Sequence, residues 1–361
     1  MPASPAIRAL TVTPLDIPLF SPFGISGGAQ AAANNVLATV ELDDGTRGWG
    51  EAAPLPPYNG ETQADARRVL DSARGWLAGR PAADWRALAA EFRERGGAGC
   101  GSAQCAFEMA LLDALTRRAG QPLWQFFGGA STELETDMTV TTGSAAEAAA
   151  GARDILARGI RQIKVKVGGK GGPAHDLERV VAIRAVAPDS PLILDGNAGL
   201  SRAHAAELAR GLQAAGIVPA VLEQWLAKDD LDGMRALREQ TGWLVAADEA
   251  ACTPDDARKI ARARAAEVVN IKLMKSGVAA ALDLATVARA EGLGLMIGGN
   301  VESILAMTFS ACFAAGLGGF RFADLDTPLF LAANPFTGGY ALDGGRISVA
   351  HIAAGHGVTP R

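Results

Sequence analysis

From about residue 133 to about residue 326, short apolar segments alternate with alanine-rich segments of helical periodicity. The eight apolar segments read LETDMTV, IKVKV, PLILDGN, PAVLEQ, WLVAADE, EVVNIKL, LGLMIGG and FRFADLD. Strands that alternate with helices at a spacing of about 20–30 residues favour a parallel (β/α)8-type barrel. A doubly wound sheet is the alternative, but no G-x-G-x-x-G motif follows a first strand. The sequence therefore predicts an α/β barrel.

The first 125 residues have a different pattern. AIRALTVTPLDIPL, NVLATVELDDGT and RGWGEAA read as strands, and the last two are joined by a DDG turn. Helical segments follow around ADARRVLDSARGWLAG, WRALAAEFRERG and SAQCAFEMALLDALTRRAG. We expect an α+β domain over residues 1–125, a barrel over 126–325 and a C-terminal segment over 326–361.

The composition limits the classes of partner. A net charge of −5 and a pI near 5.5 argue against nucleic-acid binding. No apolar run reaches the roughly 18 residues of a membrane span, and the N-terminus does not read as a signal peptide. The four cysteines form no metal-type cluster, so we expect free thiols in a reducing cytoplasm.

Charged residues stand at the ends of the predicted barrel strands, where the active sites of such barrels gather. Three carboxylates end consecutive strands: Asp195 in LILDGN, Glu223 in VLEQW and Asp248 in VAADEA. Oxygen ligands from separate strands suit Mg²⁺, and no histidine ends a strand. Salt bridges between these carboxylates and nearby lysines are the alternative, but a dense buried ion network is costly unless it is used.

Three lysines also lie at strand ends. Lys164 and Lys166 point to the same face of the second strand, and Lys272 on the sixth strand lies across the barrel. One lysine could remove a substrate α-proton while another protonates the opposite face. A lysine base needs its pKa lowered by about three units, or roughly 4 kcal/mol. We expect the neighbouring charge of Lys164 and partial desolvation to lower the pKa of Lys166.

Taken together, these motifs resemble the enolase superfamily, in its muconate-lactonizing-enzyme-like subgroup. The resemblance extends over nearly the whole chain and includes GWGEAAPLPPYNGET, FEMALLDALTRRAGQPLWQFFGG, IKVKVG, LDGN, EQW, ADE, NIKLMKSG and GGNVES. It implies a modified TIM barrel under an N-terminal capping domain, to which residues 326–361 return. It implies one Mg²⁺ on Asp195, Glu223 and Asp248. It also implies Lys166 and Lys272 as the acid/base pair of a 1,1-proton transfer through a metal-stabilised enediolate, with Lys164 assisting.

Within this subgroup, Asp324 and Asp326 in FADLDTPLFL resemble the motif with which dipeptide epimerases hold the substrate α-ammonium group. A rim pair that bridges to Arg321 or to solvent is the alternative. The resemblance also points to Thr139 and Asn300 as substrate contacts, although GGN replaces the Cys and Met that many relatives have in that turn.

The family places two loops of the capping domain over the barrel mouth, here FSPFGISGGAQ and AAPLPPYNG. Neither contains Arg or Lys, and Phe23 and Ile25 are among the residues that offer apolar surface. We therefore expect hydrophobic or small dipeptides as substrates, a mobile first loop and a homo-oligomer.

Other functions use much of the same machinery. N-acylamino-acid racemase, o-succinylbenzoate synthase and muconate cycloisomerase would share the lysines and the metal without an evident need for Asp324 and Asp326. A metal-dependent binding protein without catalysis is the alternative of another class, and the intact pair of Lys166 and Lys272 argues against it.

Overall fold

The computed structural model describes residues 5–25 and 28–361, without the side chain of Ile25. The N-terminal domain contains an antiparallel sheet of order β1-β2-β3. Its strands are β1 (Ile7–Ile25), β2 (Gly28–Leu42) and β3 (Arg47–Ala52). The predicted turn joins β2 to β3, where Gly45 has a φ of 86° and Asp44 Oδ1 accepts a hydrogen bond from Thr46 N at 2.9 Å.

Helices pack against this sheet, and the closest contact is between β3 and α4. A Cβ atom on Gly48 would lie 2.2 Å from Ala110 O, and one on Gly50 would lie 2.1 Å from Ala106 O. The glycines of the RGWGEA strand are therefore required by the approach of the helix. The helices of this domain are α1 (Pro56–Asn59), α2 (Gln63–Leu77), α3 (Trp85–Glu94), α4 (Gly101–Arg118) and α5 (Leu123–Phe126), with 3-10 turns η1 (Ala82–Asp84) and η2 (Gly97–Gly99).

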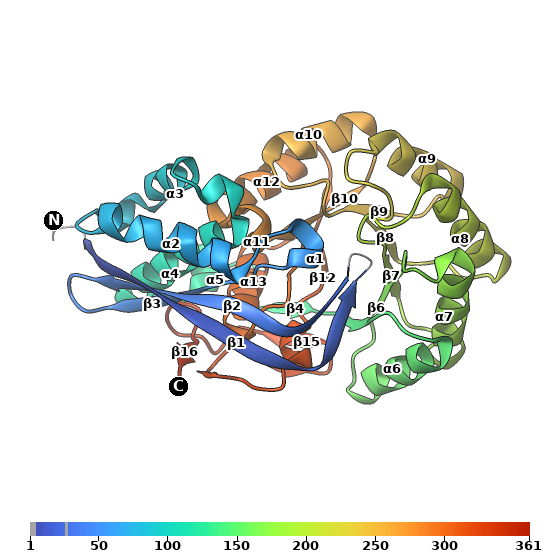
Figure 1. Cartoon of the computed structure of the whole chain (residues 1–361), viewed down its shortest axis with the longest axis horizontal. Helices are drawn as coiled ribbons and strands as arrows, with labels where there is room; N and C mark the ends of the chain where they lie inside the picture. The colour runs from blue at the N-terminus through green and yellow to red at the C-terminus, as the bar shows by residue number, and fades with distance from the viewer. Residues whose placement is uncertain (1–4, 26–27) are drawn as a thin grey trace.

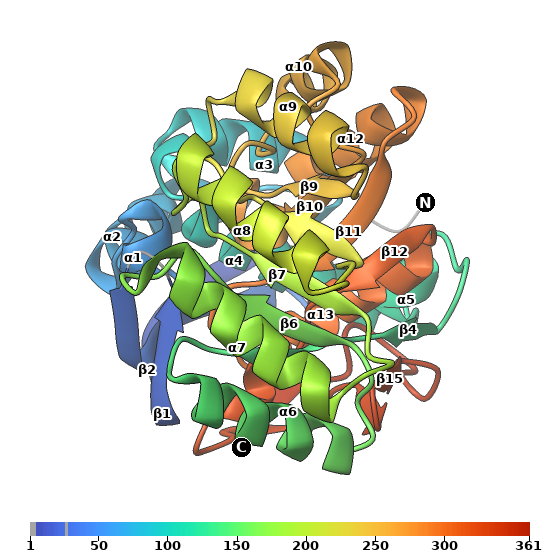
Figure 2. The same cartoon turned by 90° about the vertical axis from the view of Figure 1, so that its right-hand side faces the viewer.

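The second domain is the predicted barrel. Its eight strands are all parallel and lie in the order β12-β11-β10-β9-β8-β7-β6-β5. They are β5 (Met138–Val140), β6 (Ile163–Lys166), β7 (Leu192–Asp195), β8 (Val221–Glu223), β9 (Val245–Ala247), β10 (Val268–Lys272), β11 (Gly294–Gly298) and β12 (Phe320–Ala323). The outer helices α6, α7, α8 and α9 follow one another around the sheet (Figure 2).

The barrel helices connect successive strands. They are α6 (Ala145–Ala157), α7 (Gly172–Val186), α8 (Arg202–Ala214), α9 (Leu231–Thr241), α10 (Pro254–Ala263), α11 (Leu273–Ser276), α12 (Val278–Ala290) and α13 (Ile304–Leu317). Capping boxes at Ser144 and Thr253 begin α6 and α10. After β12, however, the described chain continues into the 3-10 turn η3 (Thr327–Phe330) instead of an outer helix.

The first and last strands of the barrel meet without a regular ladder. A single parallel bridge joins Thr136, just before β5, to Ala323 at the end of β12. The backbone N–H of Asp137 donates to Ala323 O at 2.9 Å. We call this junction, residues 136–139 and 323–326, the seam.

The C-terminal chain adds short strands. β4 (Glu133–Glu135) pairs with β15 (Arg346–Ser348), which pairs with β14 (Ala341–Asp343), and β13 (Phe336–Thr337) pairs with β16 (Thr359–Pro360). This segment also contacts the N-terminal domain, where Arg117 Nη2 donates to Val358 O at 2.7 Å. The domain boundaries at residues 125 and 325 stay predictions.

The N-terminal domain lies along one side of the barrel, with the long β1–β2 hairpin crossing the molecule (Figure 1). The domain is fastened to the turn after β11, because Asn300 Nδ2 donates to Ala53 O at 2.9 Å and Ser303 Oγ to Glu51 Oε2 at 2.5 Å. Among the described residues, no helix is long and apolar enough to cross a membrane.

Candidate active site

The three predicted metal ligands lie together at the carboxyl ends of adjacent strands. Asp195 ends β7, Glu223 ends β8 and Asp248 follows β9 directly. Asp195 and Glu223 are paired in register, and all three residues are fully buried. Each side chain points into the barrel because strand residues alternate between its interior and the helices outside.

Lys164 and Lys166 lie side by side on β6 and contact these carboxylates. Lys164 Nζ lies 3.0 Å from Asp195 Oδ2 and 2.9 Å from Glu223 Oε2, and Lys166 Nζ lies 2.6 Å from Asp195 Oδ2. Both lysines are buried. Two neighbouring ammonium groups are tolerated in this strand because Asp195 contacts both, and Lys164 also pairs with Glu223 and Asp324.

Lys272 reaches the same group of carboxylates from β10. Its Nζ lies 2.8 Å from Asp248 Oδ2 and 4.7 Å from the centre of the Tyr58 ring, which belongs to the N-terminal domain. The Tyr58 hydroxyl lies 3.3 Å from Asp248 Oδ1. Lys275 Nζ also contacts Asp248 Oδ1, at 2.9 Å. The aromatic ring therefore covers the ion pair of Lys272.

The pKa values of Lys164 and Lys272 are raised, whereas a lysine that acts as a neutral base needs a lowered pKa. Burial alone would lower the pKa of Lys164, but the carboxylates of Asp195, Asp324 and Glu223 raise it well above its ordinary value. Burial likewise opposes, and Asp248 causes, an increase in the pKa of Lys272. At these two lysines the neighbouring carboxylates therefore outweigh burial, and the decrease expected for Lys166 stays a prediction.

The donor set fits a hard divalent cation. Three carboxylates from three strands offer oxygen ligands, which Mg²⁺ prefers. Burial and neighbouring Asp195 raise the pKa of Glu223 to about 7, and burial and neighbouring Asp248 raise the pKa of Glu249 to about 8. Carboxyl groups are thus crowded here beyond what the four nearby lysines compensate, and a bound cation would balance them.

Asp324 and Asp326 lie in the same interior, at the seam. Asp324 Oδ2 accepts a hydrogen bond from Lys164 Nζ at 2.6 Å, and Asp326 Oδ2 accepts one from Thr139 N at 2.7 Å. Both aspartates are buried, whereas Arg321 is exposed and its guanidinium lies over the Phe322 ring. The alternative of a rim pair with Arg321 or solvent is therefore wrong.

The remaining residues predicted to contact the substrate are Thr139, Asn300, Phe23 and Ile25, and they differ in their surroundings. Thr139 is at the site through its backbone N–H. Asn300 is buried nearby, but its side-chain amide donates to Ala53 O and fastens the N-terminal domain. Phe23 is buried and packs edge-to-face on Phe330, with ring centres 5.4 Å apart. The side chain of Ile25 lies outside the described residues.

Sequence-family models match both domains of the chain. The model for the mandelate racemase/muconate lactonizing enzyme N-terminal domain matches residues 7–128. The model described as enolase C-terminal domain-like matches residues 147–361. The chain belongs to the mandelate racemase/muconate lactonizing enzyme family of the enolase superfamily. The resemblance and the fold inferred from the sequence are thus confirmed.

Individual members of this family are similar to the chain over almost its whole length. The aromatic dipeptide epimerase of Herpetosiphon aurantiacus is 50% identical, with 98% of each chain covered. A solved mandelate racemase/muconate lactonizing enzyme from Roseiflexus sp. is 55% identical, with a TM-score of 0.94 and 100% and 99% coverage of the two chains. The dipeptide epimerase of Enterococcus faecalis, solved with Mg and L-Leu-L-Tyr, is 28% identical, with a TM-score of 0.91 and 98% and 99% coverage. The expectation of an isomerase is confirmed at the level of these relatives.

Sequence reasoning missed several residues that this family member brings to its site. Asn270 Nδ2 donates to Glu223 Oε1 at 2.8 Å, and strand alternation from Lys272 could have identified it. The same alternation from Thr139 indicates Asp137. Lys275 and the polar contacts of Tyr58 depend on how α11 and α1 meet the barrel, so no periodicity reveals them.

Proposed function

We propose that this chain is a Mg²⁺-dependent dipeptide epimerase that inverts an α-carbon by proton transfer between Lys166 and Lys272. The observation that supports this choice most directly is the position of Asp324 and Asp326, two buried carboxylates beside the lysines. They offer a site for a substrate ammonium group. Family reactions on substrates without an ammonium group have no evident use for them.

Asp195, Glu223 and Asp248 would hold the metal. When bound, Mg²⁺ would neutralise the substrate carboxylate and so make the adjacent α-hydrogen more acidic. Lys166 and Lys272 come from β6 and β10, which are separated by three strands of the sheet. One lysine enters the cycle neutral and takes the α-proton, while the other enters protonated and donates its proton to the opposite face. Their protonation states are exchanged when the product leaves.

The two segments that we expect over the barrel mouth favour hydrophobic or small dipeptides. The segments 20–30 and 52–60 contain no Arg or Lys. Leu55 and Phe23 belong to one buried apolar cluster, and Tyr58 packs against it. An acidic substrate side chain would find no cation in these segments. The aromatic specificity in the name of the Herpetosiphon relative and the L-Leu-L-Tyr complex of the Enterococcus enzyme support this substrate class.

The test is a mass-spectrometric screen of L,L-dipeptide libraries in deuterated water with Mg²⁺. We expect one deuterium to enter the inverted position of hydrophobic dipeptides, with little exchange in L-Ala-L-Glu. A binding protein without catalysis would give no exchange with any substrate. Exchange with N-acylamino acids but with no dipeptide would overturn the proposal in favour of racemisation of acylated amino acids.

A further inference from the structure

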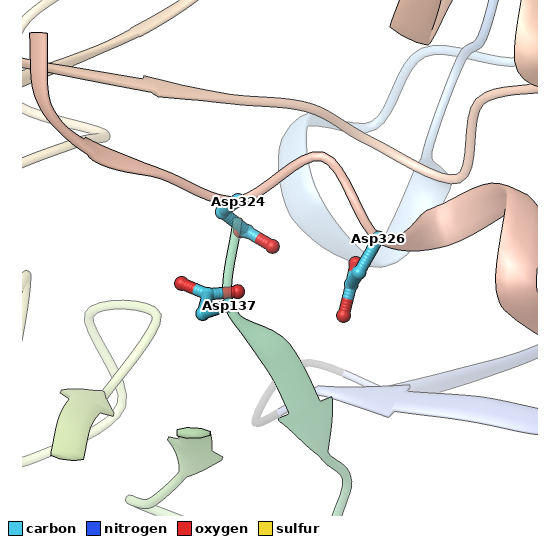
Figure 3. A group of neighbouring side chains, drawn as sticks. All are labelled: Asp137, Asp324 and Asp326. Carbon is cyan, nitrogen blue, oxygen red and sulfur yellow. The ribbon is translucent and has the colours of Figure 1, made fainter. Parts of the chain in front are cut away.

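Asp137 is a buried carboxyl group at the seam, and it has no role in the chemistry proposed above. The bridge between Thr136 and Ala323 places the residues that follow them side by side. One oxygen atom from each of Asp137, Asp324 and Asp326 therefore lies within 4.8 Å of the other two. Figure 3 shows Asp324 and Asp326 on the chain after β12, with Asp137 beside them at the start of β5.

Asp137 differs from its two neighbours in its hydrogen bonding. Asp324 accepts from Lys164 and Asp326 accepts from Thr139. In contrast, both side-chain oxygens of Asp137, and Oδ1 of Asp326, have no hydrogen-bond partner among the described residues. Asp137 is 0% exposed, and a buried polar group without a partner costs about 1–3 kcal/mol. The unused oxygens belong to two carboxyl groups of the same cluster, so they indicate a cationic ligand there.

We propose that Asp137 is the third carboxylate of the cation site formed with Asp324 and Asp326, and that this site selects substrates with an unsubstituted primary ammonium group. This inference rests on the proposed function. Because Lys164 Nζ contacts both Asp324 and Asp195, the cluster lies next to the proposed proton-transfer centre. A dipeptide bound at that centre has its N-terminus within one peptide unit of the reacting carbon.

The spacing of the three carboxylates suits an ammonium group. Three N–H bonds at tetrahedral angles, each with an N···O distance of about 2.8 Å, place their acceptor oxygens about 4.6 Å apart. That separation falls within the 4.8 Å that encloses one oxygen of each aspartate. Since Lys164 already uses one oxygen of Asp324, Asp137 supplies the acceptor that a third N–H bond needs.

The charge of the cluster is consistent with this role. Burial and the Asp324 carboxylate raise the pKa of Asp137 well above its ordinary range, and they raise the pKa of Asp326 to about 7. Protons on these carboxyl groups thus reduce the negative charge of the cluster. An ammonium group bound at the cluster would supply the positive charge that these protons provide.

The test compares Asp137→Asn with the wild-type chain on two ligands in the presence of Mg²⁺. One ligand is the best dipeptide from the screen, and the other is the same dipeptide methylated on its terminal nitrogen. For the wild-type chain we expect binding of the methylated ligand to be at least about ten-fold weaker, because one donor is lost. For the variant we expect KM and Kd of the free dipeptide to rise about ten-fold or more, kcat to change less, and the penalty for methylation to shrink.

Unfolding measurements separate this role from a structural one. Asp137→Asn should be as stable as the wild-type chain or more stable, because the substitution removes a buried carboxyl group without a partner. The matched control is Glu108→Gln, which changes a buried carboxyl of α4 that accepts from Gln104 and Ala279. We expect it to lower stability and to leave the methylation penalty unchanged.

Each other outcome overturns the inference. If the wild-type chain binds no dipeptide, the proposed function fails and this inference fails with it. If the wild-type chain binds dipeptides but Asp137→Asn keeps the same Kd and the same methylation penalty, the inference alone fails. It also fails if titration with Mg²⁺ alone shows a second bound ion that Asp137→Asn removes, since the cluster would then be a metal site.

Discussion

The interior of the barrel contains two groups of carboxylates whose surroundings differ. On β7, β8 and β9, the carboxylates come from a regular parallel ladder, and Asp195, Glu223 and Asp248 each contact a lysine. At the seam, one bridge replaces the ladder, and Asp137 lacks a hydrogen-bond partner among the described residues. Each carboxylate of the first group pairs with a lysine, whereas at the seam the described contacts pair Asp324 alone with one.

The difference indicates two kinds of specificity within one site. The ladder fixes the spacing of Lys166, Asp195 and Glu223, on which the proposed proton transfer depends. The seam arises where the first and last strands meet by a single bridge between described residues, and it adjoins the ladder because Asp324 contacts Lys164. We infer that the seam determines which substrate is held, while the ladder determines what happens to it.

Removal of Lys166 or Lys272 should have the largest effect, because these ladder residues are the proposed proton-transfer groups. Lys166→Ala and Lys272→Ala should each lower the rate of epimerisation about 10²–10⁴-fold. Each variant should still exchange the α-hydrogen of one epimer, the one whose proton the remaining lysine faces. The measurement is deuterium incorporation into each epimer separately. Lys170→Ala, at an exposed lysine after β6, is the matched control, and full activity of either catalytic variant would refute the two-base scheme.

Removal of the metal should abolish the function of the carboxylates on β7, β8 and β9 and leave the seam unchanged. Chelation by EDTA should lower turnover at least about 100-fold, and added Mg²⁺ should restore it. Asp195→Asn should behave like the chelated enzyme but should not recover when Mg²⁺ is added. Activity that persists after exhaustive chelation would show that the three carboxylates serve the lysines alone.

Much of the ladder could be predicted from the residues alone, whereas Thr139, Asp324 and Asp326 at the seam were indicated only by the family resemblance and Asp137 was missed. The apolar segments that end in Asp195 and Glu223 can be recognised as strands from the sequence. Because side chains alternate between the two faces of a strand with a period of two, the sequence also indicates which face each carboxylate points to. Which lysine each carboxylate contacts depends on the register between strands. The raised pKa of Lys272 follows from its contact with Asp248, and no periodicity in the sequence indicates that contact.

The seam depends on how the barrel closes. Asp137 and Asp324 are 187 positions apart in the chain, and the same separation divides Thr139 from Asp326, to which its backbone N–H donates. No local pattern indicates that the first and last strands meet at Thr136 and Ala323. After the eighth strand the chain enters η3, whose Phe330 packs on Phe23 of the hairpin. Such contacts come from tertiary closure and not from periodicity.

A pH effect of about ten-fold should arise at the seam. Burial and Asp324 raise the pKa of Asp326 to about 7, and an ammonium group binds the ionised form. KM for a dipeptide should therefore fall as the pH rises from 6 to 7.5, below the range in which the substrate amine itself titrates. An N-acetylated dipeptide, which has no ammonium group, is the control and should show no such change.

The free energy of unfolding should also depend on the ionisation of Asp326. It should fall as the pH rises, whereas dipeptide binding should strengthen. The folded pKa of Asp326 is above that of an unfolded aspartate, about 3.9, so its contribution to stability is present below pH 4. That contribution is lost as the pH rises through about 7. Urea unfolding of the substrate-free chain should show this decline, and Asp326→Asn should reduce it. An identical pH dependence in the variant would mean that Asp326 is already ionised in the free protein.

The smallest predicted effect concerns Tyr58, which connects the N-terminal domain to the ladder. Its ring lies over Lys272 and its hydroxyl is 3.3 Å from Asp248. A cation–π contact contributes about 0.5–1 kcal/mol or more when it is desolvated, and a long hydrogen bond contributes less. Tyr58→Phe keeps the ring and should lower kcat/KM about two-fold, whereas Tyr58→Leu should lower it about five-fold. If Tyr58→Phe were the more damaging of the two, the hydroxyl would be the group that matters, and Tyr58 would act on Asp248 instead of covering Lys272.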